Sequence, residues 1–290
     1  MPELPDVQIY LERLDAFLTG RILQRVDLVN PFVLRTVDPP TSALDGRRVV
    51  GFRRLGKRIV FTFEDDLFAV LHLMIAGRLK WRKVGAKSPK KTTHAVFVFE
   101  HGQLLFTEAA SKKRAALHVV RGEAALEEHD PGGVDVLSAD VGAFADGLRK
   151  ENHTLKRSLT SPALFSGIGN AYSDEILHRA RLSPMKLTSR LDDAEIARLH
   201  AAARDTLTEW IERSRAEVGD GFPEKVTAFR EGMAVHGRYR QPCPVCGDAI
   251  RRILKGESEC NYCPTCQNGG IVLADRGLSP LFRGRRPDGV

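Results

Sequence analysis

The chain has 290 residues, of which 42% are hydrophobic and 28% are charged, values typical of a folded protein long enough for two domains rather than of a disordered chain. Lysine and arginine total 44 against 37 aspartate and glutamate, and the resulting net charge of +7 favours a polyanionic partner but also fits a merely soluble basic protein. Since no apolar run approaches the ~20 residues of a membrane span and no basic leader precedes an apolar core, we expect no membrane partner and a cytoplasmic, non-secreted protein.

The first predicted element is a helix over about residues 5–19. Its apolar side chains recur at steps of three and four and form one stripe, which comprises Val7, Tyr10, Leu11, Leu14, Phe17 and Leu18. Gly20 marks the predicted C-terminal end. We interpret the stripe as the face that the helix buries in a core.

Residues 22 to 120 have the pattern of successive strands. They are rich in Val, Ile, Leu and Phe, several of them alternate with polar residues, and turn signals separate them. The predicted strands cover residues 22–29, 49–54, 58–63, 68–74, 95–99 and 104–107. Strands in succession predict a sandwich or barrel rather than a doubly wound sheet.

The chain changes from strands to helices after an acidic stretch over residues 123–133, which ends in Asp-Pro-Gly-Gly. The clearest later helix covers residues 191–213, where Asp192 and Glu195 form a capping-box pattern. From Ala234 the segments are short, contain cysteine and are predicted to be β-strands.

Basic residues gather at two places. Residues 82–91 hold five lysines or arginines together with glycine and proline, and Arg251, Arg252 and Lys255 lie near the cysteines. Either cluster fits a nucleic-acid contact or a solvated surface, and the sequence leaves both interpretations open.

All five cysteines lie between Cys243 and Cys266, and an odd, clustered set favours metal binding over disulfides. Sixteen residues separate the pairs Cys243/Cys246 and Cys263/Cys266, a spacing that places four thiolates around Zn²⁺. Cys260 and Cys263 also have knuckle spacing, but the first two pairs share the form Cys-Pro-x-Cys, so we expect Cys260 to be a free thiol. Four cysteine ligands predict one structural Zn²⁺ per chain, because a catalytic zinc keeps one position open.

Residue 2 is proline, and a Met-Pro start is normally trimmed to leave a secondary amine. An α-amine titrates near pH ~8, so a useful fraction is neutral and nucleophilic. Attack of such an amine on a sugar C1′ gives an iminium, and the neighbouring Glu3 is placed to donate or shuttle a proton. Many proteins begin with Met-Pro, so the motif alone does not establish catalysis.

Four blocks occur in a fixed order along the chain. They are Met-Pro-Glu-Leu-Pro-Asp-Val at residues 1–7, Gly-Lys-Arg at 56–58 followed by His72-Leu73 and Gly77, Gly-Ile-Gly-Asn-Ala-Tyr-Ser-Asp-Glu-Ile-Leu at 167–177, and the cysteine ribbon. Together they resemble the formamidopyrimidine-DNA glycosylase / endonuclease VIII family, whose helix–two-turn–helix signature the third block resembles. The resemblance covers nearly the whole chain apart from the basic loop over 82–91 and the tail.

The resemblance implies an α+β fold with an N-terminal helix and β-sandwich domain, then a helix–two-turn–helix domain with a zinc-ribbon finger. The implied domains are 1–133 (catalytic), 134–152 (linker), 153–233 (DNA-binding), 234–274 (zinc finger) and 275–290 (basic tail). The implied activity is that of a bifunctional DNA glycosylase and abasic-site lyase of base excision repair. Its partner would be double-stranded or partly unpaired damaged DNA, bound by a monomer in a bacterial-type, nucleoid-containing cytoplasm.

The resemblance also implies site residues. Pro2 would be the Schiff-base nucleophile, Glu3 its acid partner, and Lys57 a phosphate contact and candidate proton donor. The implied DNA-binding residues are His72, Ile75, His94, Lys156, Asn170 and Glu175. Asn170 would present phosphate contacts from the turn, Glu175 would orient that segment, and each histidine could instead have a structural hydrogen-bonding role.

The sequence departs from the family at three places. Residues 108–115 read Glu-Ala-Ala-Ser-Lys-Lys-Arg-Ala where the family has an Asp-Pro-Arg-Arg-Phe-Gly loop, so the arginine that reads the orphaned base and the aromatic wedge are missing. Ile75 replaces a methionine, and Ser258 replaces the finger arginine that serves the second elimination. These departures predict weak opposite-base preference.

They also support an alternative, a DNA-structure or abasic-site binding protein of the same fold that has lost base excision. A zinc-ribbon RNA-binding or ribosomal factor would explain the charge and the cysteines but not the ordered blocks.

Overall fold

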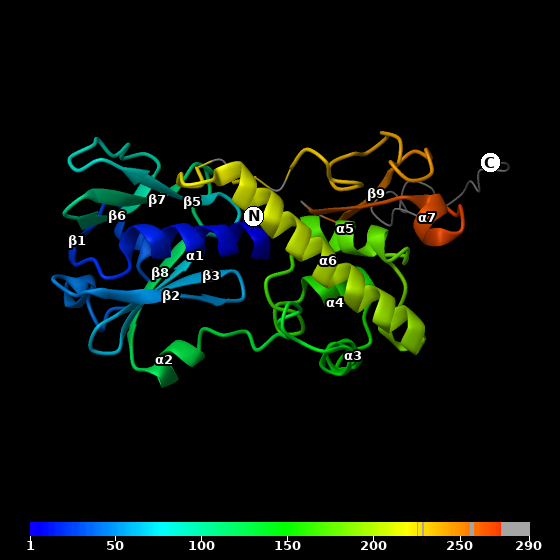
Figure 1. The fold of residues 1–290 in the computed structure, drawn as a ribbon, viewed down its shortest axis with the longest axis horizontal. Coiled ribbons are helices and arrows are strands. Elements are labelled where there is room, and N and C mark those ends of the chain that lie inside the picture. Colours follow the sequence, from blue (N-terminus) through cyan, green and yellow to red (C-terminus); the bar gives the residue numbers. More distant parts are fainter. Residues whose placement is uncertain (225, 228, 256–257, 274–290) are drawn as a thin grey trace. The chain divides into compact units, whose positions relative to one another are not determined.

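The computed structural model describes residues 1–224, 226–227, 229–255 and 258–273 (Figure 1). The chain forms two compact units, one of Met1–Gly133 with Thr208–Ala228 and one of Val134–Leu207 with Phe229–Val290. The expected basic tail over 275–290 lies outside the described residues. Within the described ranges, no helix combines the length and the apolar character that a membrane crossing requires.

The first unit begins with α1 (Leu4–Leu18), whose predicted apolar stripe is largely buried, with Tyr10 and Leu14 fully so. Proline in its first turn has no N–H to leave unsatisfied, and the Asp6 carboxylate accepts the N–H of Glu3 at 2.9 Å. The helix ends at Leu18, and Gly20 follows the C-cap residue Thr19 with a φ of +81° that favours glycine.

Two antiparallel four-stranded sheets form the body of this unit, as the predicted sandwich requires. One sheet has the order β1 (Leu23–Leu28), β6 (Thr93–Phe99), β7 (Gly102–Glu108) and β5 (Gly77–Arg82). The other has the order β2 (Val49–Leu55), β3 (Arg58–Phe63), β4 (Leu67–His72) and β8 (Ala116–Arg121). The sequence did not predict β5, in which basic residues interrupt the apolar pattern, or β8, which follows a run of three basic residues.

The core of the sandwich lies between the sheets and against α1. Phe61 of β3 stacks on Phe97 of β6 with ring centroids 5.5 Å apart, which joins the two sheets through aromatic contact. The Tyr10 hydroxyl accepts the N–H of Leu79 in β5, and α1 also contacts β2. Figure 1 shows α1 with β5, β6 and β7 on one side of it and β2, β3 and β8 on the other.

A second, smaller apolar cluster covers the outer face of the β2–β3–β4–β8 sheet. Phe68 and Val70 of β4 pack there with Leu126 of α2 (Glu123–Glu127). The register places His118 opposite Val70, and the His118 ring lies 4.5 Å from that of His129. Titratable imidazoles therefore lie within the partly buried outer face of the sheet.

The second unit is mainly helical. It contains α3 (Val141–Arg149), α4 (Leu155–Thr160), α5 (Asn170–Arg179), the first half of α6 (Asp193–Val218), the hairpin of β9 (Arg251–Lys255) and β10 (Ser258–Tyr262), and α7 (Pro264–Asn268). Short 3₁₀ turns lie at Thr188–Arg190 in this unit and at Pro31–Val33 and Thr41–Leu44 in the first unit.

Two local features of this unit bear on the sequence analysis. The capping box before α6 is present, since Glu195 donates its N–H to the Asp192 carboxylate at 2.7 Å and Asp192 donates its own to Glu195 at 3.2 Å. The range expected to be a linker contains α3, whose Phe144 and Leu148 are fully buried, so it contributes to the core of this unit.

A pH dependence of stability follows from the imidazoles of the first unit. Burial, with the neighbouring His129, lowers the pKa of His118 to about 4, and burial together with Arg58 and Lys57 lowers the pKa of His72 to about 4. An unfolded imidazole titrates near ~6.5, so between about pH 6.5 and 4 the unfolded chain binds more protons than the folded chain. The free energy of unfolding contributed by these groups is therefore complete above about pH 7 and falls as the pH drops through that window.

We predict that His118→Gln loses less unfolding free energy than the unsubstituted protein between about pH 7 and about pH 5, because it removes one of these protonations. Denaturant unfolding of both proteins at both pH values measures the difference. Equal losses in the two proteins would contradict this origin of acid sensitivity.

Candidate functional site

Three ionisable groups share one environment at the start of the first unit. Glu3, the N-cap of α1, is 2% exposed, and Pro2 is also buried. Lys57 lies in the turn between β2 and β3; burial lowers its pKa, and Glu3 opposes that shift. Burial likewise lowers the pKa of the Met1 amine, on which Glu3 and Lys57 both act. Amines whose pKa is lowered beside a buried carboxylate are suited to nucleophilic attack and proton transfer.

His72 and Ile75 lie at the end of β4 and in the loop that follows. His72 is partly buried and, with its pKa near 4, neutral at physiological pH. Ile75 is 51% exposed at the tip of the loop. The loop closes tightly at Gly77, where a Cβ would lie 2.2 Å from the carbonyl oxygen of Leu73, so only glycine fits.

His94 lies inside β6 and is 2% exposed. Its Nε2 lies 2.9 Å from the Glu108 carboxylate and its Nδ1 lies 3.1 Å from the Asn30 side-chain nitrogen. Both ring nitrogens are therefore used inside the protein, as the structural interpretation of this histidine predicted.

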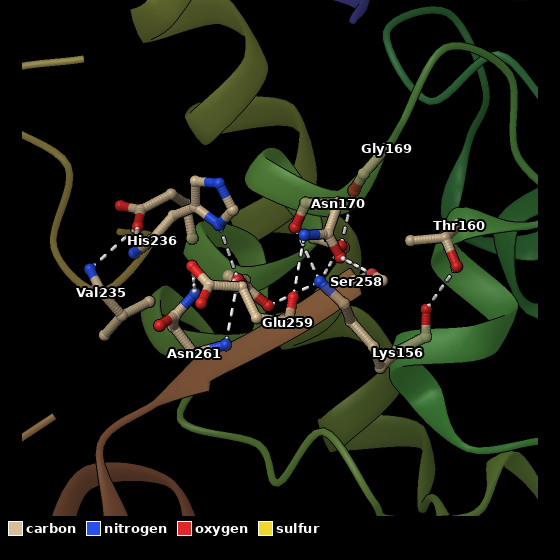
Figure 2. A network of polar contacts seen from close by, with 12 residues as sticks. Lys156, Thr160, Gly169, Asn170, Val235, His236, Ser258, Glu259 and Asn261 are labelled. Atoms are coloured by element: carbon tan, nitrogen blue, oxygen red, sulfur yellow. Dashed lines mark hydrogen bonds and ion pairs between the residues drawn. The ribbon is translucent and has the colours of Figure 1, made fainter. Parts of the chain in front are cut away.

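Lys156 and Asn170 meet in a polar network of the second unit (Figure 2). The Lys156 ammonium donates to the Asn170 carbonyl at 2.6 Å, the Ser173 hydroxyl at 2.8 Å and the Asp174 carboxylate at 2.5 Å. The Asn170 side chain donates to the Glu259 carbonyl at 2.8 Å and accepts from the Ser258 hydroxyl at 3.2 Å. The start of α5 is thereby bonded to β10.

Asp174 is the centre of this network and was not singled out from the sequence. Its second carboxylate oxygen accepts from His236 Nδ1 at 2.8 Å and from the backbone N–H of Asn261 at 3.1 Å. Although burial raises the pKa of Asp174, Lys156 and His236 together bring it below its ordinary value, so the carboxylate is ionised. Its position inside the helix–two-turn–helix block was the available signal.

Glu175 is also a buried carboxylate. It accepts the backbone N–H groups of three consecutive residues, Ala234 at 2.7 Å, Val235 at 2.9 Å and His236 at 2.9 Å. It therefore fixes the segment that leads into the zinc finger onto α5, and its carboxylate is used within the second unit.

Four cysteines form the metal site that the sequence predicted. The Sγ atoms of Cys243, Cys246, Cys263 and Cys266 all lie within 4.8 Å of one another. The Sγ–Sγ separations of 3.9 Å between Cys243 and Cys266 and 3.4 Å between Cys246 and Cys263 bracket the ~3.8 Å expected for a tetrahedral Zn²⁺ with bonds of about 2.3 Å. Cys260, in β10, lies outside this cluster, and burial raises the pKa of its thiol.

One residue beside the metal site was missed. His178 of α5 lies with Nε2 3.3 Å from the Sγ of Cys243, so a buried helix residue supports a ligand from outside the ribbon. A hydrogen bond to a ligand sulfur stabilises the charge of the thiolate.

We predict that Lys156→Met destabilises the protein by about 3–5 kcal/mol, because it leaves the buried Asp174 carboxylate without its cation. The double variant Lys156→Met/Asp174→Asn should recover part of this loss. Arg149→Met is the matched control, since its ion pair with Asp193 is exposed and contributes about 0–1 kcal/mol. Denaturant unfolding measures the free energy of unfolding of each variant. Equal losses in Lys156→Met and Arg149→Met would refute a dominant role for the buried pair.

We predict about one Zn²⁺ per chain by metal analysis, the stoichiometry of one Cys₄ site. Cys263→Ser should release the metal and unfold the finger, whereas Cys260→Ser should retain it because Cys260 is outside the cluster. Zinc loss from the Cys260 variant alone would show that the ligand set is assigned incorrectly.

The chain is similar to known proteins over most of its length. Two family models match, the formamidopyrimidine-DNA glycosylase N-terminal domain over residues 1–113 and its H2TH domain over residues 133–220. The formamidopyrimidine-DNA glycosylase of Heliobacterium modesticaldum is 34% identical over 279 residues, covering 92% of this chain and 100% of that protein. A glycosylase-like protein of Mycobacterium tuberculosis, itself uncharacterized, is 40% identical over 151 residues, covering 52% of this chain and 94% of that protein.

Two solved structures have the same fold. Fpg of Lactococcus lactis in complex with abasic-site DNA gives a TM-score of 0.82 at 25% identity, covering 92% of this chain and 99% of that one. MutM in complex with DNA containing carbocyclic 8-oxo-G also gives 0.82 at 25% identity, covering 92% and 100%. With the sandwich, the helix–two-turn–helix and the four-cysteine cluster in place, the chain belongs to the formamidopyrimidine-DNA glycosylase family.

Proposed function

We propose that this protein is a bifunctional DNA glycosylase and abasic-site lyase, acting as a monomer on damaged DNA, with Pro2 as its nucleophile. The observation that carries the proposal is the buried group formed by Glu3, Lys57 and the chain's amino terminus, in which burial lowers the pKa of both amines. Removal of Met1 would convert the Pro2 nitrogen from an amide into a secondary amine next to Glu3.

The chemistry follows from that amine. Its lone pair attacks C1′ of the damaged nucleotide, the bond from C1′ to the base breaks, and the base leaves with the proton that the Pro2 nitrogen loses. Opening of the sugar ring gives an iminium between the Pro2 nitrogen and C1′, and Glu3 supplies the proton that the ring oxygen takes up. The iminium accepts electrons as a proton leaves C2′, and the 3′ phosphate departs, which nicks the strand.

DNA contacts are proposed for residues of both units. A flipped nucleotide is required, because C1′ is not reachable within a stacked duplex. Lys57, His72 and Ile75 would contact it from the first unit, and Lys156 and Asn170 would present the start of α5 to a phosphate. His94 and Glu175, both buried, would act by positioning their neighbours. Relatives solved with abasic-site or 8-oxo-G DNA support this assignment.

A second candidate is a DNA-structure or abasic-site binding protein that has lost excision. Its specific support is Ser258, whose hydroxyl bonds to the Asn170 side chain where the family has a cation. The loss of that charge weakens the hold on a lesion phosphate without affecting Pro2 or Glu3.

We predict that borohydride traps the mature protein on abasic-site DNA and that peptide mapping places the adduct at Pro2. An N-terminal Gly-Ser extension should abolish the adduct, because the proline nitrogen is then an amide. Mapping is essential, since Lys57 is a second amine with a lowered pKa. An adduct at Lys57, or full strand cleavage by the extended protein, would overturn the assignment.

Glu3→Gln serves as the complementary variant, because it keeps the amine and removes the proton donor. It should slow base excision by about 10²–10⁴-fold. Binding of a reduced abasic-site analogue by all three proteins shows that they are folded, and binding without any adduct in the mature protein would favour the second candidate.

A further inference from the structure

Phe32 has the highest exposed fraction of any aromatic side chain in the described ranges, 81%, although the residue after it, Val33, is 1% exposed. It lies in the 3₁₀ turn Pro31–Val33 between β1 and the next segment of the first unit. The ring therefore presents apolar surface that a partner could bury.

The turn that carries Phe32 is rigid. The ring of Pro31 fixes φ at the first residue of the turn. The Asn30 side-chain oxygen accepts the N–H of Phe32 at 3.2 Å, and Val33 packs in the sandwich core. The N–H of Arg35 then donates to the Leu117 carbonyl at 2.9 Å, which ties the following residues to β8. A ring presented on such a turn loses little conformational entropy when it binds.

A buried relay connects this turn to the loop over residues 109–114. Because the Asn30 oxygen is occupied by Phe32, its nitrogen must donate to His94 Nδ1, and His94 must therefore donate from Nε2 to Glu108. The Glu108 carboxylate in turn accepts the backbone N–H of Arg114 at 3.0 Å and of Ala115 at 3.2 Å. One chain of hydrogen bonds thus fixes the turn and closes the loop.

Three exposed cations lie on the segment that follows Phe32 and on the loop that the relay connects to it. Arg35, Lys112 and Arg114 are exposed, and within the described ranges none of their side chains forms an ion pair or hydrogen bond. Aromatic rings that stack on bases, flanked by cations that contact phosphates, are the usual composition of a surface for unpaired nucleic acid.

The strand register places this surface beside residues already proposed to contact DNA. The 109–114 loop follows Glu108, which is paired with Gly77 just after Ile75, and it leads into β8 at Ala116, which is paired with His72. Phe32 therefore lies on the same edge of the sandwich as the proposed lesion contacts of the first unit.

We propose that Phe32 is a base-stacking side chain, which inserts against an unpaired base of the bound DNA while Arg35, Lys112 and Arg114 hold the adjacent phosphates. This inference rests on the proposed DNA-binding function. Phe32 would thereby supply from the 31–33 turn the aromatic contact that the short 109–114 loop lacks. It selects DNA in which a base is already unpaired, because a base inside an intact stack offers no free face.

The test is equilibrium binding of three DNAs to the full-length zinc protein: a duplex with a tetrahydrofuran abasic-site analogue, the same duplex intact, and the single strand. Phe32→Ala should weaken binding of the abasic-analogue duplex and the single strand by about 5- to 150-fold and leave the intact duplex nearly unchanged. Phe32→Trp should restore binding. Val37→Ala is the matched control, because Val37 is 91% exposed five residues further on, and it should change nothing.

The salt dependence separates stacking from charge. Phe32→Ala should keep the slope of log affinity against log salt, whereas Lys112→Ala and Arg114→Ala should each reduce it by about one. Unchanged binding of the abasic-analogue duplex by Phe32→Ala would overturn base stacking and would indicate that the ring binds a protein partner instead. An equal loss of affinity for the intact duplex would also overturn base stacking.

Borohydride trapping tests the catalytic proposal independently of the binding measurements. Phe32-dependent binding without a borohydride adduct would support the stacking assignment while refuting the nucleophile. An adduct formed equally well by Phe32→Ala at saturating DNA leaves catalysis intact, and then the binding series alone decides the role of Phe32.

Discussion

The buried carboxylate of Asp174 is the constraint on which the second unit depends. It lies on α5 and bonds to Lys156 of α4, to His236 in the segment before the finger and to the backbone of Asn261 in β10 (Figure 2). Four pieces of chain that are far apart in sequence are thereby joined at one ionised group. A buried charge is stable only while its partners remain, so the helix–two-turn–helix and the finger hairpin hold together as one body.

Two other buried acids use the same physical device in a different form. Glu175 and Glu108 each accept backbone N–H groups. The donors to Glu175 are three consecutive residues before the finger, and the donors to Glu108 are the last residue of the 109–114 loop and the residue after it. A carboxylate can satisfy several donors at once, so it can fix an irregular segment that has no ladder of its own. Buried carboxylates therefore fix irregular backbone segments in both units.

In the finger, the metal site and the polar network fix different ends of the hairpin. Four thiolates close the ribbon at one end, where His178 of α5 lies beside Cys243, and Asn170 bonds to β10 at the other end of the hairpin. Metal binding by itself would fix the ribbon internally but not its attachment to α5. That attachment comes from side chains of α5, which explains why the signature block contains polar residues that are buried.

The sequence by itself determined the parts of this protein whose signal is local. The stripe of α1, the strands in succession, the capping box of Asp192 and Glu195 and the paired Cys-Pro-x-Cys knuckles depend on spacing along the chain, and the structure confirms each of them. The exclusion of Cys260 from the metal set also followed from a local repeat. Such features are determined early because periodicity and ligand geometry act over a few residues.

Only the tertiary structure decided the roles that depend on distant partners. The hydrogen bonds of His94 to Asn30 and Glu108 appear only when β6 is in place, and Lys156 is bonded to Asp174, eighteen positions away. The exposure of Phe32 beside the buried Val33 was equally invisible in a run of apolar letters. Burial and long-range hydrogen bonds are properties of the packed chain, so residue type and spacing could not assign them.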